Sequence, residues 1–69
     1  MEDQARHDIR RLLKGFGIEA DETVMAHLAS NPGLPTLRLR LTLEDLTDYG
    51  DIPLKQPLFV QVEGEVNNN

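Results

Sequence analysis

Apolar residues in the first part of the chain recur at the spacing that places them on one face of an α-helix. These residues are Ala5, Ile9, Leu12, Leu13 and Phe16. Acidic residues precede this stripe and basic residues end it, which is the arrangement that the helix dipole favours. The pattern predicts an amphipathic helix over residues 3–14. We expect Gly15 to end it as a left-handed cap, with Phe16 and Ile18 anchoring the turn that follows.

A second, shorter helix is predicted over residues 22–30. Asp21 is a good N-terminal capping residue, because its carboxylate can accept hydrogen bonds from the first free backbone amides. The apolar stripe of this segment consists of Val24, Met25 and Leu28. Two prolines and a glycine within residues 31–35 cannot continue a helix, so the element should end there.

Strict alternation of leucine with polar residues over 36–44 is the clearest pattern in the chain. It indicates a half-buried strand with one face in water. The leucines are Leu37, Leu39, Leu41 and Leu43, and the residues between them include Arg38 and Arg40.

A second strand is predicted over about 58–66, after an acidic loop at 45–57. Val60, Val62 and Val66 share one face of it, and Glu63 and Glu65 share the other. Pro57 stands at its entrance and interrupts regular pairing. Residues 67–69, three asparagines, are expected to form a disordered tail.

The two strands have a preferred antiparallel register, in which paired residue numbers sum to 103. It places Leu41 opposite Val62 on the apolar face, and it sets Arg40 against Glu63 and Arg38 against Glu65 on the polar face. A slip of one residue would send every side chain to the wrong face.

The order of the elements predicts an α+β protein with two N-terminal helices on one face of a C-terminal antiparallel hairpin. We expect a single domain over residues 1–66. The positions that satisfy both periods form the predicted core: Ile9, Leu12, Leu13, Phe16, Ile18, Val24, Met25, Leu28, Leu37, Leu39, Leu41, Leu43, Val60 and Val62.

Charge disfavours general nucleic-acid binding. The chain of 69 residues has a formal net charge of −5, whereas a nucleic-acid binder needs clustered basic residues. The distribution is uneven: residues 1–14 hold four basic residues against three acids, and residues 15–69 hold three against nine. A mildly basic helix on an acidic body is typical of an ordinary solvated surface, and it also suits docking to another protein.

No catalytic, metal-binding or cofactor-binding motif emerges from the residue pattern. The chain lacks cysteine, its one serine is Ser30, and His7 and His27 have no ligand-like spacing. The carboxylates of residues 44–51 lack the ligand order of a calcium-binding loop. No apolar run is long enough to span a membrane, and the first residues lack the apolar centre of a secretory signal, so we expect a cytoplasmic protein.

These observations favour a non-catalytic protein-interaction module, a regulatory or accessory subunit that binds another protein or a second copy of itself. The candidate interaction residues are Arg6, Arg10, Lys14, Arg38, Arg40, Tyr49 and Ile52. A small enzyme or ligand-binding protein with a pocket between subunits is the alternative. Nucleic-acid binding through the basic residues is a weaker one.

The strand over residues 36–43 is the edge most open to another chain. A two-stranded sheet has two unpaired edges, and this strand contains no proline. The strand after Pro57 is better protected, since it also contains Gly64. Pairing of 36–43 with its copy about a two-fold axis would bring Arg38 and Arg40 of both copies together, whereas an acidic partner strand would avoid that repulsion.

Overall fold

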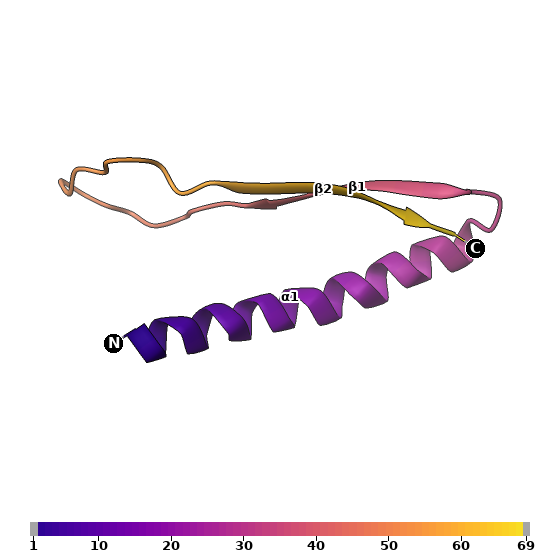
Figure 1. The fold of residues 1–69 in the computed structure, drawn as a ribbon, viewed down its shortest axis with the longest axis horizontal. Coiled ribbons are helices and arrows are strands. Elements are labelled where there is room, and N and C mark those ends of the chain that lie inside the picture. The colour runs from indigo at the N-terminus through magenta and orange to yellow at the C-terminus, as the bar shows by residue number, and fades with distance from the viewer. Residues whose placement is uncertain (1, 69) are drawn as a thin grey trace. The chain divides into compact units, whose positions relative to one another are not determined.

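In the computed structural model, which describes residues 2–68, the chain is an α+β protein (Figure 1). Helix α1 (Glu2–Ser30) is followed by strands β1 (Thr36–Leu43) and β2 (Val60–Asn67). The chain divides into two compact units. The helix unit ends at Leu34, and the hairpin unit begins at Pro35.

The helix unit contains one continuous helix where two were predicted. Gly15 does not cap a helix and Asp21 does not begin one, since both lie inside α1. Neither Gly15 nor Gly17 has a positive φ angle. A glycine in a helix costs only about 1 kcal/mol relative to alanine. No proline occurs before Pro32, so the strong helix formers on both sides carry the helix through the glycines.

The end of α1 was predicted correctly and has a local cause. The side-chain amide of Asn31 donates to the carbonyl oxygen of His27 (2.8 Å), and the backbone amide of Asn31 donates to that of Leu28 (3.2 Å). The amide of Leu34 then donates to the carbonyl of Asn31 (3.0 Å), which closes a turn with Pro32 in its second position.

The hairpin has the predicted register. Strands β1 and β2 pair antiparallel, with Leu41 opposite Val62, Arg40 opposite Glu63, and every other pair also summing to 103. Strand β2 begins two residues later than expected and runs to Asn67, which had been assigned to the tail. The amide of Asn68 also donates to the carbonyl of Pro35 (2.9 Å). Asn69 lies outside the described residues.

The loop between the strands continues their line and turns back at the far end (Figure 1). Its tip is a turn in which the amide of Ile52 donates to the carbonyl of Tyr49 (2.9 Å). Gly50 has a φ angle of 58° at the second position, which suits the type II′ turn that glycine favours there.

The prediction of a conventional core was wrong for most of its members. Among the described residues Leu28 is the one buried hydrophobic side chain, and Val24, Leu37 and Leu39 are half-buried. A lone helix or a two-stranded sheet has no second layer of its own to cover its apolar face. The predicted core residues that are exposed are Ile9, Leu12, Leu13, Phe16, Ile18, Met25, Leu41, Leu43, Val60 and Val62.

Candidate functional site

The basic residues of α1 form a short row along the helix. Arg6, Arg10 and Lys14 are spaced four residues apart and are exposed, so they lie one above another on one side of α1. Arg11 lies on another side, where its guanidinium forms an ion pair with Asp8 (3.6 Å). The described side chains include no ion-pair partner for Arg10 or Lys14.

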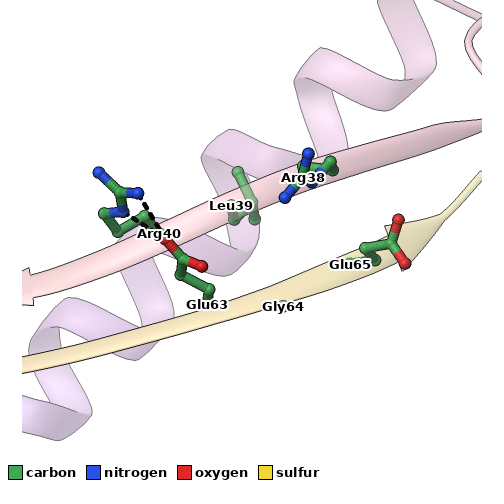
Figure 2. A pocket seen from close by; sticks show the side chains of 6 residues that line it. All are labelled: Arg38, Leu39, Arg40, Glu63, Gly64 and Glu65. Carbon is green, nitrogen blue, oxygen red and sulfur yellow. Dashed lines mark hydrogen bonds and ion pairs between the residues drawn. The ribbon is translucent and has the colours of Figure 1, made fainter.

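On the hairpin, the polar face carries two arginines of β1 opposite two glutamates of β2 (Figure 2). Arg40 Nε donates to Glu63 Oε2 (2.6 Å), and a terminal nitrogen of Arg40 lies 2.5 Å from the same oxygen. Arg38 and Glu65 occupy opposite positions without such a bond. These four residues, with Leu39 and Gly64, line an open hollow of about 620 Å³.

The hydrogen-bond ladder determines which amides of β1 face outward. The bond between Asn68 and Pro35 identifies that pair as a hydrogen-bonded one. Hydrogen-bonded and non-hydrogen-bonded pairs alternate along an antiparallel ladder. The amides of Leu37, Leu39, Leu41 and Leu43 therefore point toward β2, and those of Arg38, Arg40 and Thr42 point away from it. Among residues 2–68 β1 pairs with β2 alone, so its other edge is open, and this strand carries Arg38 and Arg40.

The loop tip is organised by carboxylates that accept hydrogen bonds from their own segment. The hydroxyl of Tyr49 donates to one oxygen of Asp45, and the amide of Thr47 donates to the other (3.0 Å). These bonds stabilise the ionised form and lower the pKa of Asp45, the Tyr49 hydroxyl having the larger effect. The same bond raises the pKa of Tyr49. Ile52, the last residue of the turn that begins at Tyr49, is 67% exposed.

A second hollow, of about 360 Å³, lies where the loop joins the strands. Its apolar lining comes from Leu43, Tyr49, Leu54, Pro57, Leu58 and Phe59. Sequence reasoning did not identify this site. The signal available was the apolar run of residues 57–60 in a segment predicted to begin a strand.

The candidate interaction residues form three groups. Arg6, Arg10 and Lys14 are together on α1, Arg38 and Arg40 are together on β1, and Tyr49 and Ile52 are together at the loop tip. The first group belongs to the helix unit and the other two to the hairpin unit.

The metal-ligating side chains of residues 2–68 do not gather into a candidate metal site, because three or more of them come together nowhere in this part of the chain. Asp48, another acid of the loop, accepts the amide of Gly50 (2.9 Å). No helix in the described range is both long and apolar enough to cross a bilayer.

Comparison of the chain with protein-family models, with curated proteins and with solved structures finds no match.

Proposed function

We propose that this protein is a non-catalytic interaction module, a regulatory or accessory subunit that binds another protein through the apolar face of α1 or the free edge of β1. The observation that carries this proposal is the exposure of its large apolar side chains. Within residues 2–68 only Leu28 is a buried hydrophobic residue, while fifteen large ones are exposed. Exposed apolar surface on this scale is typical of a surface that another molecule covers.

The free edge of β1 suits an extended acidic segment of a partner. The outward amides of Arg38, Arg40 and Thr42 can donate to the backbone of an added strand. The two arginines give this edge a positive charge, although Arg40 is already bound to Glu63. An acidic segment complements that charge, whereas a second β1 would place arginine against arginine.

Capture from cell extract with matched variants tests this proposal. Thr42→Pro removes an outward amide and leaves the inward ladder of β1 in place, so it should block strand addition with little damage to the hairpin. Thr42→Val, which retains the amide, is the control. The proposal predicts a specific protein that wild type and Thr42→Val both capture.

The variants also identify the surface that binds. Loss of the captured protein with Thr42→Pro assigns it to the β1 edge, and loss with Leu12→Glu assigns it to the α1 face. The proposed function is contradicted if wild type captures no specific protein. It is also contradicted if Thr42→Pro and Leu12→Glu both capture the protein as well as wild type does.

A further inference from the structure

The exposed apolar face of α1 is long and lies on one side of the helix. Its larger members are Ile9, Leu12, Leu13 and Phe16, which are exposed by 55 to 70% of their surface. Ala20 and Val24 continue the same stripe at four-residue steps and are half-buried. The helix of 29 residues is roughly 43 Å long at 1.5 Å per residue, so this stripe could accompany another helix over most of its length.

Charge is separated along the axis of α1. Up to residue 14 the helix holds four basic residues against three acids, a net charge of +1, whereas residues 15–30 hold three acids and no arginine or lysine, a net charge of −3. Two such helices side by side and parallel would set basic half against basic half. In an antiparallel arrangement the Arg10 and Lys14 region of one copy faces the Glu19 and Glu22 region of the other.

We propose that α1 pairs antiparallel with α1 of a second copy of this chain, about a two-fold axis near residues 14 and 15. This inference deepens the proposed function and rests on it, because it names the occupant of the α1 face. A two-fold axis gives each copy the same environment and closes the assembly at two.

The residue sizes along the stripe define a register for this pair. With paired numbers summing to 29, Phe16 of one copy lies beside Leu13 of the other, and Ile9 lies beside Ala20. Val24 then meets Ala5. Ile9 and Val24 each face an alanine, which lets the two helices approach closely. A seam of one helix pair is at the small end of specific interfaces, so the pairing is tested at tens of micromolar protein.

Sedimentation equilibrium of the purified 69-residue chain at tens of micromolar tests the pairing. We expect a species of twice the 7.8 kDa chain mass. Phe16→Glu should reduce it to the chain mass, because it places a charge in the seam. Ile18→Glu is the matched control: Ile18 is 54% exposed against 55% for Phe16, and it lies roughly 200° around the helix. A wild-type monomer, or equal loss of the dimer in both variants, would overturn the proposal.

Cysteine cross-linking tests the antiparallel register in the otherwise cysteine-free chain. An equimolar mixture of Ile9→Cys and Ala20→Cys should form an intermolecular disulfide on air oxidation, because these positions face each other. Neither variant alone should do so, since two copies of residue 9 would be roughly 16 Å apart along the axis. A disulfide dimer of Ile9→Cys alone would indicate parallel helices and contradict the proposal.

These results separate the inference from the proposed function. A monomer in the centrifuge removes the second copy as the occupant of α1, and the capture experiment still decides whether the chain binds another protein. Should Phe16→Glu lose its helix by circular dichroism, the cysteine mixture decides the pairing without it.

Discussion

The helix unit and the hairpin unit both leave an apolar face exposed, yet they distribute charge in different directions. Along α1 the charge changes from basic to acidic between the two halves of one element. In the hairpin it changes between elements: β1 holds Arg38 and Arg40, and β2 holds Glu63 and Glu65. Each half of the helix therefore finds opposite net charge in the other half of a second, antiparallel copy. The hairpin has complementary charge across its own two strands.

This difference determines how each unit can associate. Either edge of the hairpin would meet its own copy with like charges, which disfavours closed pairing of two hairpins through the same strand. In an antiparallel pair of α1 helices, the half with net positive charge faces the half with net negative charge. Consequently we assign the second copy to α1 and leave the β1 edge to a partner of opposite charge.

The largest effect should come from breaking α1 at its weakest residues. Gly17→Pro removes a backbone hydrogen bond and places the ring against the preceding turn, so it should cost about 3 kcal/mol of helix stability. Circular dichroism should show a clear loss of helix. Gly17→Ala, which changes the same position without the ring, should keep or increase the helical signal. Unchanged helicity in the proline variant would mean that α1 ends before Gly17.

Filling the gap on the apolar face of the hairpin should have a smaller, opposite effect. Gly64 lies opposite Leu39 in the ladder, and a side chain there would meet open space. Gly64→Val should therefore stabilise the hairpin by about 0.5–1 kcal/mol in urea unfolding. Gly50→Ala also meets open space, but the φ angle of 58° should make it destabilising. If both substitutions stabilised the hairpin, or both destabilised it, the backbone geometry observed at Gly64 or at Gly50 would be contradicted.

The coupling energies of the two arginines of β1 with their opposite glutamates should be smaller again. A double-mutant cycle on Arg40 and Glu63 should give a coupling of about 0.2–1 kcal/mol, reduced by salt, because the pair is exposed and bonded. The same cycle on Arg38 and Glu65, which face each other without a bond, should give a lower value. Equal couplings would show that position in the ladder, and not the observed bond, sets the energy.

The smallest effect concerns the loop tip. In the folded chain the pKa of Asp45 is below its ordinary value. The stabilisation this provides is present above the pKa of the unfolded chain and is lost as pH falls through the folded-state pKa. Tyr49→Phe removes the main cause, so the pKa of Asp45 should rise toward its ordinary value. The amide of Thr47 should retain part of the depression. Titration of the Asp45 carboxyl carbon by NMR measures this, and an unchanged pKa would contradict the assigned cause.

How far the sequence predicts this protein differs between the same two units. Alternating residues define a strand face and its register together, so the pairing of Leu41 with Val62 could be predicted. In the helix unit, Gly15 and Asp21 had the residue types of a cap. The same residues are tolerated inside a helix when their neighbours favour it, and residue type alone does not decide between these outcomes.

One candidate surface could be predicted from the sequence and another could not. The Arg40–Glu63 pair follows from the register. The hollow beside Phe59 depends on how sixteen loop residues fold back, for which no period exists. The extent of burial was predicted wrongly, because a periodic apolar face shows that a surface must be covered without showing whether the same chain covers it.

The length and charge separation of α1 require that the helix pass unbroken through residue 15, and the substitution Gly15→Ala tests this most directly. Gly15 has no positive φ angle, and a methyl group there would meet open space. In a continuous helix the alanine should stabilise the protein by about 1 kcal/mol in urea unfolding and increase its helical signal. If Gly15 instead capped a helix in the left-handed conformation, the same substitution would destabilise the protein, and the continuous α1 and the antiparallel pairing built on it would both be contradicted.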